Sequence, residues 1–304
     1  MKKIKDFQNE INELEKLAAQ RYLYSIAKRF LLANLIFSIP FIILYFILSL
    51  FFPVLIDYKI YISITISIVN LMIMNKYQYE KIKEATIIQE QFDVDILQIS
   101  WNPYLINKSI KIELINEYNK KYLQKFKDHE KLKNWYDVDD SNIPIEFARL
   151  ICQRENIWWD KKLKSLYHKI ITFIPIIVFF ILLIISLLYD HKLKVFINEI
   201  FYLSPIIIYC VDQHYKYKIS LDSLDDLNSK IETLIDQAIR SKLNPHELTI
   251  NSRLLQDRIY YHRLNSALVF DYLFKKMKDK YQDLRVKSSN NLIEDYLKIH
   301  NNPQ

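Results

Sequence analysis

The chain has no glycine among its 304 residues, and this absence excludes several kinds of site. A phosphate-binding P-loop, a dinucleotide-binding Gly-x-Gly-x-x-Gly turn and an EF-hand loop each need backbone that other residues do not supply. Any nucleotide bound here must therefore be held by side chains or by helix N-termini. The abundant Ile, Lys, Asn, Tyr and Phe have AT-rich codons, so genome composition competes with a structural reason for the absence.

Cysteine is also scarce. Cys152 and Cys210 are too few for a disulfide framework and carry no metal-ligand spacing, so we expect a reduced, cytosol-facing protein. Residues 1–29 are too polar for a secretory signal peptide. The net charge of +7 at pH 7 is typical of nucleic-acid binding or of basic flanks beside anionic lipid. In a membrane protein the second interpretation is favoured.

Long apolar stretches are abundant, and they form two closely spaced pairs. The stretches 30–56 and 170–189 are long enough to cross a hydrocarbon core of about 30 Å. The stretch 60–74 is short and contains Asn70, and 195–211 contains Asn198, Glu199 and Pro205. Because the linkers 57–59 and 190–194 are so short, each pair is expected to be an antiparallel transmembrane hairpin.

Basic residues are distributed unevenly around these pairs. Seven Lys or Arg residues precede residue 30, and lysines follow the first pair and precede the second. The turns inside the pairs carry Lys59 in one case and Lys192 with Lys194 in the other. By the positive-inside rule, both termini and the middle region face the cytosol. A buried helical hairpin of a soluble protein is the disfavoured alternative.

The polar regions have helical periodicity. Apolar residues recur four apart from Ile106 to Phe126, which predicts one helix there. Residues 224–238 alternate three and four apart like a coiled-coil seam, but an ordinary bundle helix is favoured because the pattern barely exceeds two heptads. A capped start at Asn244 predicts a long helix that runs on through Leu273 and Met277. No strand-like alternation stands out.

The predicted fold class is therefore all-α: an integral membrane protein with two transmembrane helical hairpins, four spans, and a helical cytosolic domain built from the N-terminal, middle and C-terminal regions. Both hairpins share an Ile-Pro pair, which suggests an internal repeat, although coincidence is favoured. The predicted parts are a cytosolic amphipathic helix (1–29), hairpin 1 (30–77), a cytosolic helical region (78–168), hairpin 2 (169–211) and a cytosolic C-terminal helical region (212–304).

Catalytic signals are weak. Ser25 and Lys28 match a Ser-x-x-Lys spacing that occurs often by chance, and Asp137, Asp139 and Asp140 fit a solvated loop better than a cation site. The histidines form no His-Glu-x-x-His or Cys/His pattern. We therefore expect no catalytic residue, no metal and no enzymatic activity.

Binding signals are stronger, because polar and aromatic residues gather in two clusters. Arginine forks suit phosphate, and aromatic faces suit stacked bases. The alternative, favoured from the residues alone, is that Arg–Asp pairs join helices. Glu199, inside an apolar stretch, either lines a pore or reaches the outer headgroups, and both interpretations stay open. The candidates for signal binding or for contacts between helices are Trp101, Gln153, Arg154, Trp159, Gln256, Asp257, Arg258 and Arg263.

Several strings together resemble the SMODS-associated four-transmembrane (S-4TM) effector family, across nearly the whole chain. Each string alone is weak, but their order around two hairpins is fairly specific. They are LAAQRYLYSIAK (17–28), QEQFDVD (89–95) leading to Trp101-Asn102, NWY (134–136), CQREN (152–156) with Trp159-Asp160, and QDRIY (256–260) followed by Arg263.

The resemblance implies an effector of a bacterial anti-phage system, encoded beside a nucleotide second-messenger synthetase. It implies an inner-membrane protein that forms homo-oligomers. On an infection signal this protein oligomerises or opens and so halts the infected cell. The implied partners are the lipid bilayer and a cyclic oligonucleotide, with no cofactor and no DNA or RNA polymer. A constitutive transporter or channel component is the main alternative, and a membrane-anchored enzyme is the third.

Overall fold

A computed structural model describes residues 2–301, with the side chains of all but residues 50, 71, 273–280, 282 and 301. These residues are mostly helical and contain no strand, which confirms the all-α prediction. The elements are α1 (Ile4–Phe7), α2 (Ile11–Ser38), α3 (Pro40–Phe51), η1 (Pro53–Ile56), α4 (Lys59–Val69), η2 (Asn70–Met74), α5 (Asn75–Ile96), α6 (Ile112–Phe126), η3 (Glu130–Leu132), α7 (Ile145–Leu188), α8 (Leu193–Tyr202), α9 (Ser204–Ile239), α10 (Pro245–Asn265) and α11 (Asp271–Asn301).

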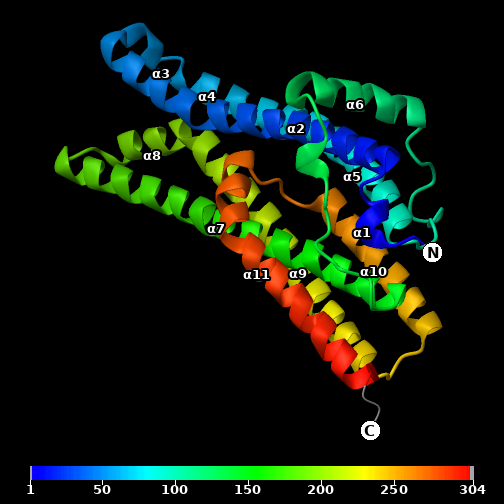
Figure 1. The fold of residues 1–304 in the computed structure, drawn as a ribbon. Helices are drawn as coiled ribbons and strands as arrows, with labels where there is room; N and C mark the ends of the chain where they lie inside the picture. Colours follow the sequence, from blue (N-terminus) through cyan, green and yellow to red (C-terminus); the bar gives the residue numbers. More distant parts are fainter. Residues whose placement is uncertain (1, 302–304) are drawn as a thin grey trace.

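The apolar stretches are parts of long helices that continue into polar regions. Three helical runs within the described residues, Ile11–Ser49, Lys59–Ile96 and Ile145–Leu188, are long and apolar enough to cross a membrane. The pair α8 and α9 makes a fourth span if its 57° bend lies within one span. The turns at α3 and α8 lie at one end of the molecule, and α1, α10 and the end of α11 lie toward the other (Figure 1). We call this second, polar end the head.

Large apolar side chains cover the outer surface of the spans. Examples are Phe51, Met72, Phe173 and Leu187, which are 73, 71, 59 and 73% exposed. A soluble protein rarely exposes a contiguous apolar surface of this kind, because water makes it costly. These side chains therefore face lipid, and the chain is a membrane protein.

Prolines have different effects in the two hairpins. Pro40 begins α3 after a break at Ile39, and Pro205 is the second residue of α9, after the bend at Leu203. Pro175, in contrast, lies inside the continuous helix α7. Proline removes one helical hydrogen bond and crowds the preceding turn, so a break is the commoner result. The shared Ile-Pro pairs thus occupy different local structures, which favours coincidence over an internal repeat.

The head is closed around the larger hydrophobic core, to which α1, α2, α5, α7, α9 and α10 all contribute. The sequence pattern at 224–238 lies here. Of the residues that make the pattern, Leu224, Leu227, Ile231 and Ala238 are at most 3% exposed and belong to this core. Leu234 is only partly buried against it, and the neighbouring Ile235 is buried instead. The favoured prediction of an ordinary bundle helix is confirmed. This seam is buried within the chain, so it offers no free surface for assembly.

Two helix predictions were wrong in their bounds. The helix predicted from Ile106 begins at Ile112, because the side chain of Gln91 bonds both the N–H and the C=O of Ile110, at 3.0 and 3.1 Å. The long helix predicted from Asn244 has the expected capping box but ends at Asn265. The Ala267 N–H donates to the Ser220 hydroxyl at 3.0 Å instead of to a helical carbonyl.

The chain resumes as α11 at Asp271, and Leu273 and Met277 fall within it, although their side chains lie outside the described set.

Left-handed turns are made without glycine. Gln98, Lys127, Asn134, Asp190 and Ser241 have φ between 47° and 66°. A Cβ in this region costs roughly 1–2 kcal/mol per residue relative to the right-handed form. Lys127 follows α6 and Ser241 follows α9, where the left-handed residue ends the helix. The absence of glycine is thus met at these turns with other residues.

Candidate functional site

A buried polar network at the centre of the head joins α5, α7 and α10. Arg263 on α10 forms an ion pair with Asp93 on α5, whose side chain is 0% exposed. The Gln256 amide donates to Glu90 at 2.8 Å and to Asp93 at 3.1 Å. We call this set the head network, and its members are Glu90, Asp93, Tyr136, Gln153, Arg253, Gln256 and Arg263.

The head network brings the two predicted clusters together. Gln153 on α7 donates to the side-chain oxygen of Gln256 on α10 at 3.1 Å, and both residues are 0% exposed. Arg253 bonds Glu90 at 2.7 Å and Asp257 at 2.6 Å. The Tyr136 hydroxyl completes the shell of Asp93 by donating at 2.7 Å. Buried charges in proteins are paired in this way because an unpaired one is very costly.

Burial governs the electrostatics of the network. Burial first, and then the neighbouring charge of Asp93, raises the pKa of Glu90 from 4.5 to about 7. Burial and the proximity of Asp93 also hold the pKa of the Tyr136 hydroxyl well above its ordinary value. Burial opposes the charge of Arg263, but Asp93 outweighs it and raises the pKa of that guanidinium. Arg263 is therefore a fixed cation beside Asp93, whereas Glu90 titrates near neutrality.

The raised pKa of Glu90 predicts a pH dependence of stability. Between pH 4.5 and about 7 the folded chain keeps a proton that the unfolded chain has lost, so stability falls as pH rises. The full shift corresponds to about 3 kcal/mol. Chemical unfolding across this range should show a downward slope that Glu90→Gln removes. Parallel profiles of stability against pH for the unchanged protein and Glu90→Gln would contradict the assignment of the slope to Glu90. Groups that titrate in both proteins cancel when one profile is subtracted from the other.

The remaining candidates lie around the head network. Asp257 accepts from Asn102 at 2.9 Å, and the indole N–H of Trp101 donates to the Ile106 carbonyl at 3.2 Å. Trp159 is partly buried against the second hydrophobic core, which lies mainly between the spans, with its ring centroid 6.4 Å from that of Trp158. These contacts fix the loop after α5 and the start of the third span.

Arg154 and Arg258 both reach α9. Arg154 bonds Glu232 at 2.7 Å and Ser288 at 2.9 Å, with 18% of its side chain exposed. Arg258 pairs with Asp226 at 2.6 Å, and its side chain is 54% exposed. Arg258 is therefore the more accessible of the two.

A second buried polar group lies where the head meets the spans. Asp160, Lys164 and His262 contact one another, and His262 also bonds Ser223 at 3.1 Å. Burial lowers the pKa of Lys164 and of His262, and Lys164 and His262 lower that of Asp160 despite its burial. Lys164 and His262 are at most 6% exposed, whereas the Asp160 side chain is 31% exposed. The group holds α7, α9 and α10 together.

Sequence reasoning missed Glu90, Asp93 and Tyr136 as site residues. All three lie inside strings that carried the family resemblance, but none was selected because each looked like an ordinary helix or turn residue. The predicted arginines themselves supply a usable signal for Glu90 and Asp93, since an arginine that faces a core requires a carboxylate nearby. The Asp160–Lys164–His262 group had no comparable signal, because His262 lies about a hundred residues after the other two in sequence.

Glu199 lies at the membrane end, opposite the head. Its carboxylate accepts from Lys59 at 2.6 Å, which joins α8 to the start of α4. The two hairpins therefore share an ion pair near their turns. Charged residues inside membrane bundles usually pair in this way.

The three acidic loop residues have structural contacts. Asp137 pairs with Arg285, Asp139 accepts from Ser141 at 2.6 Å, and Asp140 accepts the Ile4 N–H at 2.7 Å. Within the part of the chain that the structure describes, no group of three or more His, Cys, Asp or Glu side chains is arranged to hold a metal ion.

The fold and the site define a helical multi-span membrane protein whose spans continue into a head closed by a buried ionic network. The sequence profile of the SMODS-associating 4TM effector domain matches residues 2–292, and the chain belongs to this family. It is also 28% identical over 281 residues to a Bacillus cereus (strain VD146) protein described as a probable CBASS effector molecule, covering 88% of this chain and 90% of that protein. No solved structure matches the chain.

Family membership confirms the resemblance found from the sequence, and it implies four spans. The bent pair α8–α9 then supplies the fourth span, beside the three straight helical runs. The chain is an anti-phage effector by family and by this relative.

Proposed function

We propose that this effector is controlled by a cyclic oligonucleotide from a partner synthetase and acts by breaching the bacterial inner membrane. It acts without an enzymatic step, as a homo-oligomer, with both termini and the head in the cytosol. Its proposed domain organisation is the set of five regions predicted from the sequence. The observation that carries the proposal is the continuity of the spans with the head.

This continuity provides a mechanical route from signal to membrane. Helices α2, α5, α7 and α9 each contribute buried residues to the head and run directly toward or into an apolar segment (Figure 1). A rigid helix transmits a shift or rotation along its length. Rearrangement of the head network therefore moves the spans.

The candidate residues supply suitable chemistry for an anionic signal. Among the described atoms, Nη2 of Arg263 and Nε of Arg253 are buried without a hydrogen-bond partner. Arg258 is half exposed beside them on α10. Phosphate accepts such charge-assisted bonds strongly. The signal is proposed to compete with Asp and Glu for these arginines and so to loosen α10 from α5 and α9.

The rival proposal is a constitutive transporter or channel component. It requires traffic in the absence of any signal. The tightly paired head network favours a restrained resting state instead, since a constitutive carrier has no need of a closed head that joins all its spans.

The test is membrane potential in cells that express the protein with its partner synthetase under phage infection. Arg154→Ala and Arg258→Ala should abolish depolarisation, because each removes a guanidinium proposed to meet the signal, while the proteins still insert. Arg240→Ala is the matched control, since Arg240 forms an exposed pair with Asp236 on α9 at 2.7 Å, apart from the candidates. Depolarisation in both variants equal to that of the unchanged protein would remove the sensing role of these arginines.

A further inference from the structure

One face of the second span is polar along its whole length. At 1.5 Å per residue, the run from residue 59 to residue 78 extends roughly 28 Å, close to the thickness of a hydrocarbon core. Other residues of the same run, such as Ile64, Ile68 and Met72, are 46, 53 and 71% exposed and face lipid. The polar residues follow at intervals of three to five: Lys59, Ser63, Ser67, Asn70, Asn75 and Gln78.

A π-helical turn keeps this face in register. The interval of five falls on η2 (Asn70–Met74), where the Asn75 N–H donates to the Asn70 carbonyl. In an uninterrupted α-helix, Asn75 would point away from Asn70, because five residues turn the helix by about 140° beyond a full circle. The extra residue of a π-turn restores Asn75 and Gln78 to the common face. A span that served only as a lipid anchor would need no such correction.

The helices opposite this face are polar at the same levels. Ser63 donates to the Tyr202 carbonyl at 2.7 Å, and Asn70 donates to the Ser38 hydroxyl at 2.7 Å. Lys216 bonds Asn75 at 3.1 Å. We call the whole set the membrane seam. It comprises Lys59, Ser63, Ser67, Asn70, Asn75 and Gln78 with Asn34 and Ser38 of α2, Glu199 of α8, and Tyr209, Asp212 and Lys216 of α9.

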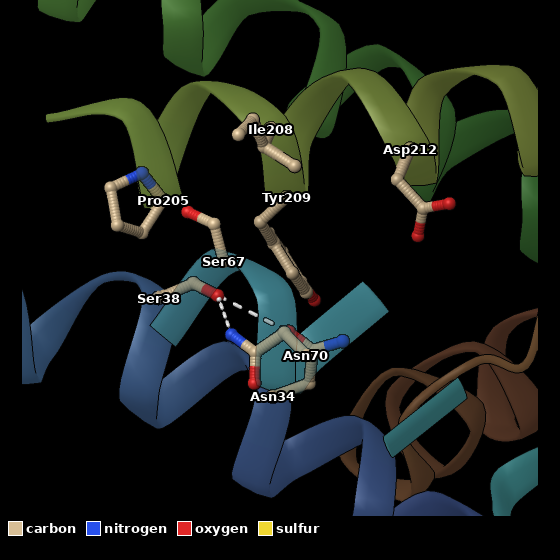
Figure 2. A pocket seen from close by; sticks show the side chains of 8 residues that line it. All are labelled: Asn34, Ser38, Ser67, Asn70, Pro205, Ile208, Tyr209 and Asp212. Carbon is tan, nitrogen blue, oxygen red and sulfur yellow. Dashed lines mark hydrogen bonds between the residues drawn. The ribbon is translucent and has the colours of Figure 1, made fainter. Parts of the chain in front are cut away.

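The seam has a narrow point and a wider inner mouth. The narrow point is a hollow of about 10 Å³, room for roughly one water molecule, between α2, α4 and α9 (Figure 2). Of its eight lining residues, Asp212 alone is charged. Tyr209, which also lines it, is 3% exposed, and its side chain interacts with that of Tyr167. Toward the head, a cavity of about 280 Å³ is lined by Asn75, Gln78 and Lys216 among others.

Interhelical adhesion alone does not account for this arrangement. A few polar pairs suffice to hold spans together, at about 0.6 kcal/mol each. The seam instead runs from the Lys59–Glu199 pair at one end to the Asp212–Lys216 pair at the other. It also encloses polar space that simple packing would fill: the hollow at the narrow point and the cavity at the inner mouth.

We infer that the membrane seam is the closed form of a pathway for small monovalent cations, which opens when hairpin 1 moves away from α9. The inference rests on the proposed membrane effector function and specifies the path that ions take through the protein. Asp212 is the one charged residue that lines the narrow point, and once opening separates it from Lys216 it favours cations over anions. Hydroxyl and amide groups along the rest of the seam replace part of the ion's hydration shell.

The test needs no nucleotide. The purified protein is placed in liposomes of phosphatidylethanolamine and phosphatidylglycerol loaded with potassium and a large fluorescent dye. Asn70→Asp puts a hydrated charge beside the narrow point and, at about pH 8, should raise potassium efflux about tenfold over the unchanged protein while the dye is retained. Adding Asp212→Asn should lower the preference for potassium over chloride. Thr65→Asp is the matched control on the lipid-facing side of α4 and should not raise efflux.

Two results would overturn the inference: no increase in efflux from inserted, folded Asn70→Asp, or release of dye in step with potassium. The first would make the seam adhesive only, and the second would indicate general bilayer disruption. Both are independent of the proposed function, which fails separately if the synthetase never causes depolarisation in cells.

Discussion

Replacing Arg263 with alanine is expected to destabilise the head by about 3–5 kcal/mol, because it leaves the buried carboxylate of Asp93 without its ion-pair partner. For a domain of this size the loss corresponds to a drop in Tm of roughly 10 °C. Thermal unfolding followed by circular dichroism in detergent measures it. The effect should be large because Asp93 is 0% exposed and solvent cannot replace the guanidinium.

The double variant Arg263→Met with Asp93→Asn separates loss of the pair from loss of packing. It should recover most of the lost stability, since no unpaired charge then remains buried. Arg240→Ala, whose pair with Asp236 is exposed, should cost no more than about 0.5 kcal/mol. A cost for Arg263→Ala as small as that of the Arg240 control would show that solvent enters the head network, contrary to the burial described.

Replacing Ile231 with alanine should cost about 2–5 kcal/mol, because Ile231 is 0% exposed within the larger core and its truncation leaves a cavity. Chemical unfolding of the detergent-solubilised protein measures this loss. Thr233→Ala, on the exposed face of the same helix, should cost much less and serves as the control.

The same variant distinguishes a core position from an assembly position. If the apolar face of α9 at 224–238 packs only within the chain, Ile231→Ala lowers stability while light scattering gives an unchanged mass for the folded protein. A changed mass with full stability would instead mean that this face joins copies of the chain.

Much of the fold was predictable, because the physics of apolar helices is local. Long charge-free stretches and short linkers identified the spans, and the capping residues Asn244 and Glu247 located the start of α10. The errors arose where distant side chains replaced helical hydrogen bonds. Gln91 holds Ile110 outside α6, and Ser220 captures the backbone at Ala267. No sequence pattern near the affected helix predicts either contact.

The site was less predictable than the fold. Arg263, Gln153 and Gln256 were selected from local density of polar groups, and they do meet in one network. Their partners on α5 were not selected, because burial of Glu90 and Asp93 depends on α10, which follows them by some 150 residues. The polar face of the second span was also underestimated: Asn70 was noticed, but Ser63 and Ser67 gain meaning only beside α2 and α9.

The larger core draws on residues from Ile4 to Ile259, with both hairpins between them in the chain. Translation order therefore fixes assembly order: the spans enter the membrane first, and the head closes only when α10 has left the ribosome. The N-terminal helices, which in many proteins fold first, must wait here for nearly the whole chain. A stop codon before residue 245 would leave Glu90 and Asp93 without their α10 partners, in a chain whose spans are already in place.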